Sequence, residues 1–135
     1  MSAHPLQWSV FTLGSEAREK KKAVEVPPAL VVSRESANVA LPVVTVLPLT
    51  WMKSGRRIYP NEMILPSGIT GLDREAVLMA HQIRTIPKSW LSTRTGSVDD
   101  PALRSAVRAA VRIQLDLENL CEDGSVEPAR EERGR

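Results

Sequence analysis

The sequence predicts one small, mainly β domain, in which an open antiparallel sheet or barrel is followed by a single α-helix. Short runs of β-branched and aliphatic residues recur between turn-forming residues, which is the spacing typical of a small antiparallel sheet. Only the segment after Asp100 has the period of an amphipathic helix. The chain has 135 residues, of which 42% are hydrophobic, and this length and composition are those of a single domain with one core.

Four segments are expected to be strands, and residues 8–13 can add another at the front. The four are residues 28–33, 43–50, 58–65 and 76–82, and they are bounded by Asn38, Gly55, Gly68 and Gly71. Pro48 and Pro60 lie within two of these segments. Because a proline cannot donate a hydrogen bond to a neighbouring strand, we expect bulges or edge positions at these two residues. Bulges bend a sheet toward closure.

The helix is expected to begin at Pro101. Asp100 offers an N-cap side chain, and a proline at the first helical position loses no hydrogen bond. Apolar residues then recur at spacings of three and four and predict a stripe that docks on the sheet; these residues are Ala106, Ala110, Ile113, Leu117 and Leu120. Three arginines, Arg104, Arg108 and Arg112, lie roughly on the opposite side. We interpret them as a solvated face rather than as phosphate contacts.

The composition changes only near the ends of what we interpret as one domain over residues 1–120. Residues 16–27 are expected to form an atypical charged loop, and residues 121–135 a disordered charged tail. The formal charge of +2 divides unevenly, since residues 1–120 hold 15 Lys and Arg against 11 Asp and Glu, whereas the tail holds 3 against 5. A basic body is compatible with a polyanionic partner but is too weakly charged to establish one.

The composition also excludes several classes of function. A single cysteine, Cys121, cannot form an intramolecular disulfide, and this favours a reducing cytoplasm over secretion. No run reaches the 18 apolar residues of a membrane span, and the first residues lack the pattern of a signal peptide. The sequence has no Gly-rich phosphate loop, dinucleotide fingerprint or close-spaced Cys and His set. We therefore expect no membrane association, no metal and no other cofactor.

Histidine is scarce in the chain. Of the two histidines, His4 lies near the terminus, so His81 is the one imidazole that a folded site could use as a proton carrier near neutral pH. A lone histidine in a strand is more often structural than catalytic, and the residues alone leave both roles open.

Several segments resemble, in their order and spacing, the PemK/MazF family of toxin–antitoxin endoribonucleases. They are PALVVSRESAN from Pro28, VTVLPLT ending at Thr50, IYPNEMIL from Ile58, GLDREAVLMAHQIRTI from Gly71, and Gly96 before the helix. The likeness extends from Pro28 to Leu117. It implies a small open antiparallel β-barrel of the Src-homology-3-like type, as in PemK, MazF and CcdB, with a C-terminal helix. It also implies a cytoplasmic bacterial homodimer that cuts single-stranded RNA without metal and is blocked by a cognate antitoxin.

The resemblance assigns catalytic roles to Thr50, His81 and Arg84. Attack of a 2′-hydroxyl on the adjacent phosphate needs a base, an acid for the leaving 5′-oxygen, and donors that stabilise the charged phosphorane. Thr50 falls on the family's active-site threonine, whose hydroxyl can donate to the phosphate. His81 stands where relatives often carry an acidic residue, which favours a catalytic role. Arg84 is interpreted either as a phosphate contact or as an anchor that donates to backbone carbonyls.

One position departs from the family. An arginine normally stands directly before the PALVVS strand, and here Pro27 takes its place. Proline offers neither charge nor donor, and loss of one preorganised donor commonly costs on the order of 100-fold in rate. Either a basic residue of the charged loop, Arg18 or Lys20 to Lys22, replaces the arginine, or the protein is a weakened or inactive relative. A misassigned gene start or a frameshift is the third alternative.

The residues expected to bind RNA are Arg18, Lys22, Ser33, Trp51, Arg56 and Arg57. Trp51 is interpreted either as a stacking platform for an unpaired base, worth ~1 to 3 kcal/mol, or as part of a dimer contact. Arg56 and Arg57 lie in the turn after Trp51 and are either RNA contacts or solubility charges.

The alternative to a ribonuclease is a non-catalytic barrel protein, either a decayed toxin that only binds its antitoxin or a DNA gyrase poison. The fold does not choose between these functions. The LPLT and QIRT segments favour RNA cleavage, whereas Pro27 favours decay.

Overall fold

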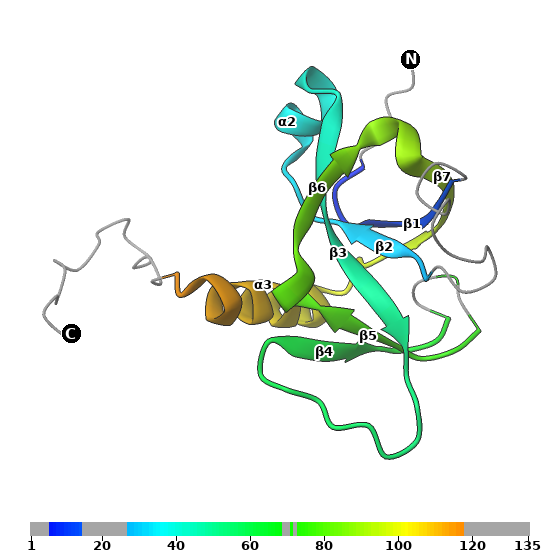
Figure 1. The fold of residues 1–135 in the computed structure, drawn as a ribbon, viewed down its shortest axis with the longest axis vertical. Coiled ribbons are helices and arrows are strands. Elements are labelled where there is room, and N and C mark those ends of the chain that lie inside the picture. The colour runs from blue at the N-terminus through cyan, green and yellow to red at the C-terminus, as the bar shows by residue number, and fades with distance from the viewer. Residues whose placement is uncertain (1–5, 15–26, 69–70, 72, 118–135) are drawn as a thin grey trace, which may run out of the picture.

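The structure is a computed structural model, and it describes residues 6–14, 27–68, 71 and 73–117 (Figure 1). Strands account for most of the ordered elements, and one long helix follows them. In chain order the elements are β1 (Ser9–Leu13), β2 (Ala29–Val31), α2 (Glu35–Ala40), β3 (Val43–Trp51), β4 (Glu62–Leu65), β5 (Ala76–Met79), the 3-10 turn η2 (Ala80–Gln82), β6 (Arg84–Pro87), the 3-10 turn η3 (Lys88–Trp90), β7 (Leu91–Ser97) and α3 (Pro101–Leu115). The predicted mainly β fold with a C-terminal helix is confirmed.

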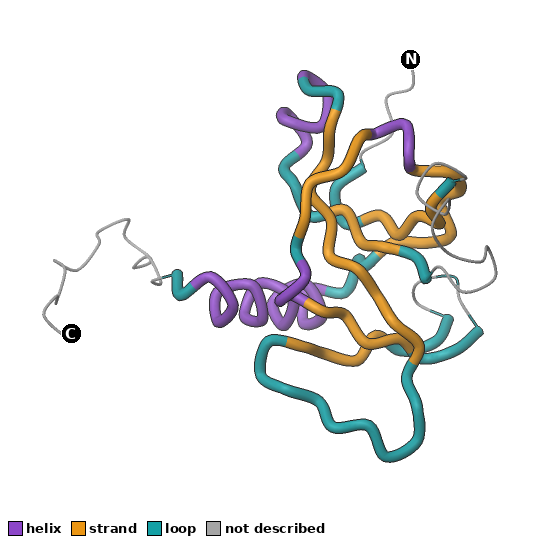
Figure 2. The backbone as a smooth tube through the Cα atoms, in the orientation of Figure 1, coloured by secondary structure: helices purple, strands orange, loops and turns teal. Residues whose placement is uncertain are grey.

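The strands form one open antiparallel sheet of seven strands, with β4 and β7 at its two ends. The order is β4-β5-β3-β2-β1-β7, and β6 also pairs with β3. The nine-residue strand β3 is the centre of this arrangement and runs through the middle of the molecule (Figure 2). It pairs with β2 along one edge, while β6 and then β5 share its other edge.

Pro48 lies where this second edge of β3 changes partner. Pairing with β6 ends at Val46, and pairing with β5 begins at Leu49. The amide of Leu49 donates to Pro28 on the β2 side, 3.1 Å away, so the nitrogen of Pro48 faces the other edge. The prediction was a bulge or an edge position at Pro48: β3 is a central strand, but the edge that Pro48 faces is unpaired at this residue. The proline is tolerated because its nitrogen meets the gap between two partner strands.

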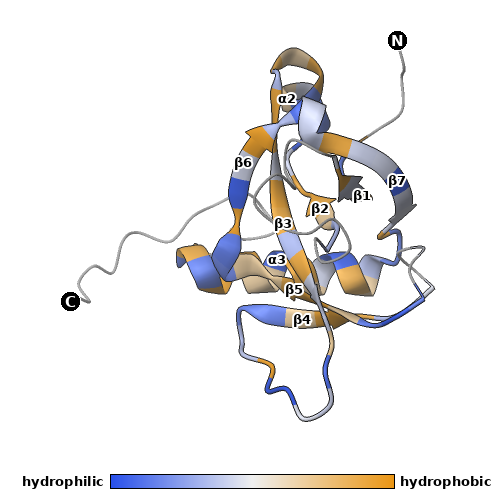
Figure 3. Ribbon diagram, turned by 45° about the vertical axis from the view of Figure 1, so that its right-hand side comes forward, coloured by the Kyte–Doolittle hydropathy of each residue, from blue (hydrophilic) through white to orange (hydrophobic). Residues whose placement is uncertain are grey.

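The sheet buries apolar side chains on both faces. One cluster lies between the sheet and α3 and includes Val10, Leu30, Leu47, Leu78 and Val107. The second lies in the hollow of the curled sheet, where side chains of β2, β3 and β6 meet partly buried aromatic residues; its buried members are Ala29, Val31, Val44, Val46 and Ile86. Burial on both faces explains why β3 is apolar along most of its length (Figure 3).

Helix α3 begins as predicted, but its buried stripe differs. The Asp100 carboxylate accepts a hydrogen bond from the amide of Ala102 at 3.1 Å, and Pro101 occupies the first turn. The helix packs on the sheet through Leu103, Val107, Ala110 and Val111. In contrast, the predicted stripe residues Ile113 and Leu117 are 55% and 52% exposed. The stripe was therefore wrong toward its C-terminal end, because the helix extends past the edge of the sheet (Figure 1).

The arginines of α3 are not simply a solvated face. The guanidinium carbons of Arg104 and Arg108 lie 5.0 and 5.2 Å from the ring of Trp8, which is buried. Arg104 also donates to the carbonyl of Val98 at 2.7 Å. Arg104 and Arg108 therefore also cover a core residue through cation–π contacts. Arg108 and Arg112 are exposed, as predicted for a solvated face, whereas Arg104 is half-buried.

The strand boundaries differ from the prediction at two places. The segment 58–65 is a strand only from Glu62, so Pro60 lies in the preceding turn, and the segment 76–82 becomes a 3-10 turn at Ala80. Elements α2, β6 and β7 were not predicted from the residue pattern. Strand β7 is mostly polar and has no fully buried residue, and α2 has only six residues, so neither carries a clear hydrophobic period. The charged loop at 16–26, Leu120 and the tail lie outside the described residues.

Candidate active site

Two of the three predicted catalytic residues share one face of the sheet. Arg84 in β6 lies opposite Val46 of β3. Thr50 follows Val46 by four residues along β3, and alternation places both on the same face. Thr50 is half-buried, whereas Arg84 is exposed. Among the described residues, the Arg84 guanidinium contacts only the ring of Trp90, 5.9 Å from its centroid. Its donors are therefore free to bind an anion over this face.

Pro27 lies beside Thr50 on the same face. β2 pairs with β3 through Ala29 and Pro48, and the hydrogen bond from Leu49 to Pro28 continues this register by one residue. One further step places Pro27 opposite Thr50, with its side chain on the Thr50 face. A longer cationic side chain at position 27 would thus extend over the face that carries Thr50.

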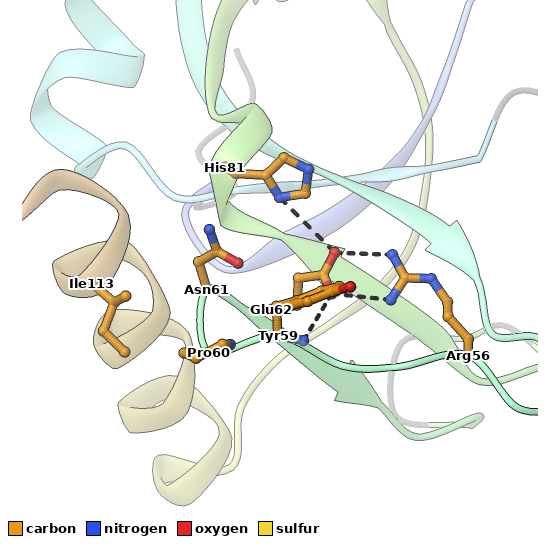
Figure 4. Close-up of a pocket in the computed structure, with 7 residues that line it drawn as sticks. All are labelled: Arg56, Tyr59, Pro60, Asn61, Glu62, His81 and Ile113. Carbon is orange, nitrogen blue, oxygen red and sulfur yellow. Dashed lines mark hydrogen bonds and ion pairs between the residues drawn. The ribbon is translucent and has the colours of Figure 1, made fainter.

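His81 belongs to a pocket of about 570 Å³ next to η2 (Figure 4). The segment 52–61, which joins β3 to β4, forms most of its wall. The lining residues are Arg56, Tyr59, Pro60, Asn61, Glu62, His81 and Ile113. His81 is exposed and projects from η2 toward Glu62, so imidazole, guanidinium and carboxylate groups meet in one pocket (Figure 4).

The Glu62 carboxylate is the centre of this group. Its side chain is 3% exposed and accepts two hydrogen bonds from Arg56, at 3.0 and 2.9 Å, and a third from the amide of Tyr59 at 3.1 Å. The His81 Nδ1 atom lies 3.9 Å from Glu62 Oε2. The hydrogen bonds from Arg56 hold the pKa of Glu62 below its usual value, although burial acts in the opposite direction. The same pair raises the pKa of Arg56.

Short turns place these groups together. The Arg56 amide donates to Lys53 and the Glu62 amide donates to Tyr59, so segment 52–61 folds back on itself before β4 begins. The carbonyl of Asn61 accepts from the amide of Ala80 at 3.0 Å and ties β4 to η2. The Asn61 side chain donates to Gln114 of α3 at 3.0 Å. These contacts fix the position from which His81 projects.

Sequence reasoning missed Glu62. It treated the carboxylate as an ordinary strand residue, because nothing in the residue pattern showed that its side chain is buried. The available signal was the acidic side chain a few residues after two adjacent arginines, at the junction of a turn and an apolar run. A buried carboxylate needs a cationic or hydrogen-bonding partner, and the turn supplies one.

The other predicted RNA contacts are dispersed. Trp51 packs against the cluster beneath α3, on the face opposite Thr50, and Arg74 covers its ring at 4.5 Å. The Ser33 hydroxyl donates to Asn38 and accepts from the amide of Thr45. Arg57 is exposed and lies 5.4 Å from the Tyr59 ring centroid. Arg18 and Lys22 lie outside the described residues.

Two further features concern metals and membranes. In the part of the chain that the structure describes, no three His, Cys, Asp or Glu side chains are grouped so as to hold a metal ion. The helices of that part are also too short or too polar to cross a bilayer.

Comparison with known proteins places this chain in a family. Residues 7–115 match the family model of the PemK-like, MazF-like toxin of type II toxin–antitoxin systems. The chain belongs to this toxin family. The match includes both groups of site residues described above. Endoribonuclease MazF9 of Mycobacterium tuberculosis is 32% identical to this PemK/MazF toxin over 109 residues, which cover 77% of the chain and 85% of the relative.

Solved structures of similar proteins share the fold of this PemK/MazF toxin. A mycobacterial endoribonuclease in complex with its cognate antitoxin superimposes with a TM-score of 0.68 at 23% identity, covering 85% of this chain and 98% of the other. A second mycobacterial endoribonuclease gives 0.65 at 25% identity, with coverage of 87% and 95%. MazF of Deinococcus radiodurans gives 0.63 at 21% identity, with coverage of 86% and 100%.

Proposed function

We propose that this PemK/MazF toxin is a metal-independent, sequence-specific endoribonuclease that cleaves single-stranded RNA and is inhibited by a cognate antitoxin. The observation that carries the proposal is the family match over the whole described domain, which includes the face with Thr50 and Arg84. The relative that is 32% identical is named an endoribonuclease. A lone cysteine and an intracellular substrate favour the cytoplasm.

On this proposal, the Thr50 face binds the scissile phosphate. The 2′-oxygen of one nucleotide attacks the adjacent phosphorus, the bond to the 5′-oxygen breaks, and a 2′,3′-cyclic phosphate and a 5′-hydroxyl result. The Thr50 hydroxyl and the unpaired Arg84 guanidinium donate hydrogen bonds to the phosphorane oxygens, where negative charge develops. No metal is needed for this stabilisation.

His81 is the proposed proton carrier. An exposed imidazole can accept the proton of the 2′-hydroxyl or return one to the leaving 5′-oxygen. His81 lies three residues before Arg84, and η2 leads through Ile83 into β6. The pocket and the Thr50 face are therefore joined by one continuous segment of chain.

The decisive experiment is incubation of the purified protein with a long single-stranded RNA in EDTA, followed by sequencing of the fragment ends. Cleavage at a short recurrent sequence is the expected result. Thr50→Ala and Arg84→Gln should each lower the rate about 100-fold, the order of magnitude for loss of one phosphorane donor. Cleavage that is lost in EDTA and restored by magnesium would contradict the metal-free mechanism.

A substitution at Pro27 is expected to increase cleavage in the same experiment. Because position 27 lies opposite Thr50, Pro27→Arg should add a guanidinium beside the phosphate and raise the cleavage rate strongly. Alanine at Arg18 and at Lys20 to Lys22 tests the other source of the missing cation, and a drop in rate would identify it. If the parent cuts at a high rate and neither change alters it, Arg84 or Arg56 must supply the charge.

The non-catalytic alternatives are less favoured. The relatives that match are named endoribonucleases and MazF toxins, so a gyrase poison has little support. A decayed toxin would bind its antitoxin but leave RNA intact in EDTA and in magnesium alike, including when Pro27 is replaced by arginine.

A further inference from the structure

Glu62 is the most enclosed charged group at the pocket, and the cleavage steps above do not use it. Its two oxygens are divided between neighbours. Oε1 accepts hydrogen bonds from Arg56 and from the amide of Tyr59, whereas Oε2 accepts the second Arg56 bond and faces His81 Nδ1 at 3.9 Å (Figure 4). One buried carboxylate thus binds a permanent cation, Arg56, and also lies near an imidazole that can become cationic.

The two cations act on each other through this carboxylate. A protonated His81 and the ionised Glu62 would attract each other at their 3.9 Å separation, and this attraction is one of the causes that lower the pKa of Glu62. Arg56 opposes that effect, since it is itself cationic and takes two of the carboxylate's hydrogen bonds. Replacing Glu62 and replacing Arg56 should therefore change how readily His81 is protonated in opposite directions.

Few other groups face the imidazole. Among the residues that line the pocket, β4 supplies Glu62, and segment 52–61 supplies Arg56 and the Tyr59 phenol. Helix α3 contributes only the uncharged Ile113. The side-chain nitrogen of Gln82 lies 3.4 Å from His81 Nε2. Glu62 and Arg56 are thus the charged groups of the pocket that His81 meets.

We propose that Glu62 is a positioning residue that orients the His81 imidazole and stabilises its protonated form, with Arg56 limiting that stabilisation. The inference rests on the proposed function, in which His81 carries the proton. Nδ1 faces the carboxylate, which leaves Nε2, beside the Gln82 amide, as the nitrogen that would exchange the proton with the RNA oxygens. When the 2′-hydroxyl proton moves to Nε2, the positive charge of the ring forms beside Glu62, which remains ionised and accepts no proton.

The first test needs no RNA. The His81 imidazole is titrated by nitrogen-15 NMR in the parent, Glu62→Gln, Arg56→Gln and Arg57→Gln. Glu62→Gln should move the midpoint of the titration to lower pH by about 0.5 pH unit or more, as expected for a charge at this distance. Arg56→Gln should move it to higher pH. Arg57→Gln removes a neighbouring charge that stacks on Tyr59, and should leave the midpoint nearly unchanged.

The opposite signs keep the test informative even when one variant misfolds. If Glu62→Gln does not fold, Arg56→Gln still leaves the carboxylate in place and must raise the midpoint. Equal midpoints in the parent and the folded variants, or shifts of the same sign for Glu62→Gln and Arg56→Gln, overturn the proposal.

The second test uses cleavage and a double-mutant cycle. Glu62→Gln should lower kcat roughly tenfold with little change in KM, and should have no further effect in a His81→Gln background, because both changes remove the same assisted proton transfer. Multiplicative losses would overturn the positioning role. A parent that cuts no RNA would contradict the proposed function instead, and the NMR titration would still decide whether Glu62 controls His81.

Discussion

At the scale of single residues, Gly71 lies so close to the backbone of a neighbouring strand that no larger residue fits. Its φ is +81°, and a Cβ atom built on it would clash with the carbonyl oxygen of Thr95 in β7. Two conditions therefore require glycine here, a left-handed backbone and direct contact with a neighbouring strand. Gly71 can lie this close to β7 only without a side chain.

We expect Gly71→Ala to lower the free energy of unfolding by more than about 2 kcal/mol, because the backbone of β7 or of the turn must move. Gly55→Ala and Gly68→Ala are matched controls. Both have positive φ values, of 79° and 90°, but no atom within 4 Å of the added Cβ. Each should cost only about 1 kcal/mol, from the backbone conformation alone. Urea unfolding of the three variants measures the difference, and equal losses would show that the clash is relieved without cost.

The lowered pKa of Glu62 also predicts how the free energy of unfolding depends on pH. Its pKa is lowered in the folded protein, chiefly by the Arg56 hydrogen bonds, from the ordinary value of 4.5. Because the ionised form is favoured in the native state, its contribution is complete above about pH 4.5 and is lost as the pH falls through the native pKa. Glu35 acts in the same direction. Burial raises its pKa, but hydrogen bonds from the amides of Gln7 and Leu6 outweigh that effect.

The measurement is the free energy of unfolding at pH 7 and at pH 3.5. We expect the parent to lose more stability over this interval than Glu62→Gln, whose side chain does not ionise. Lys53→Gln removes an exposed charge nearby and serves as the control. It should lose as much unfolding free energy over this pH interval as the parent does. An identical acid loss in the parent and Glu62→Gln would contradict this account of the carboxylate.

At the scale of elements, α3 has a defined start that can be tested separately from its packing. The Asp100 carboxylate accepts from Ala102, so Asp100→Ala leaves a helical amide without its cap and should cost about 1 kcal/mol. Asp99→Ala removes a neighbouring carboxylate that is 78% exposed and lies 3.4 Å from Arg104. Exposed pairs contribute little, so this control should change stability by a few tenths of a kcal/mol. Equal costs in thermal unfolding would show that the cap contributes nothing beyond its charge.

At the scale of the whole molecule, one end of the described domain exposes a group of large apolar side chains. They lie near the C-terminal end of α3, directly after it, and on segment 52–61, and comprise Tyr59, Ile113, Leu115 and Leu117. A helix that extends past the edge of its sheet with apolar residues exposed is typical of a surface that a partner covers. The predicted homodimer would use this surface to bury residues that the monomer leaves in water.

We expect light scattering at micromolar concentration to report about twice the chain mass of 14.9 kDa. Ile113→Asp should shift the protein toward the monomer, because a carboxylate would be buried in the dimer contact. Arg112→Asp, on an exposed neighbouring position, is the matched control and should leave the mass unchanged. A monomeric parent would contradict the dimer, and an unaffected Ile113→Asp would move the contact to another surface.

The sequence by itself determined the features that depend on local pattern and composition. The mainly β fold, the start of α3 at Pro101 and the apolar strand at 43–50 follow from side-chain periods and caps, which act over a few neighbouring residues. The order of the segments also indicated the toxin family that the comparisons confirmed. The site roles of Thr50, His81 and Arg84 stay predictions.

Only the tertiary structure decided which distant side chains meet. Strand β7 is too polar to show a hydrophobic period and is placed by pairing with β1, and Ile113 is exposed because the sheet ends before the helix does. The face that carries Thr50 and Arg84 depends on the register between β3 and β6, which lie more than thirty residues apart in the chain. The burial of Glu62 between Arg56 and His81 depends on how segment 52–61 folds onto η2, and no local pattern contains that information.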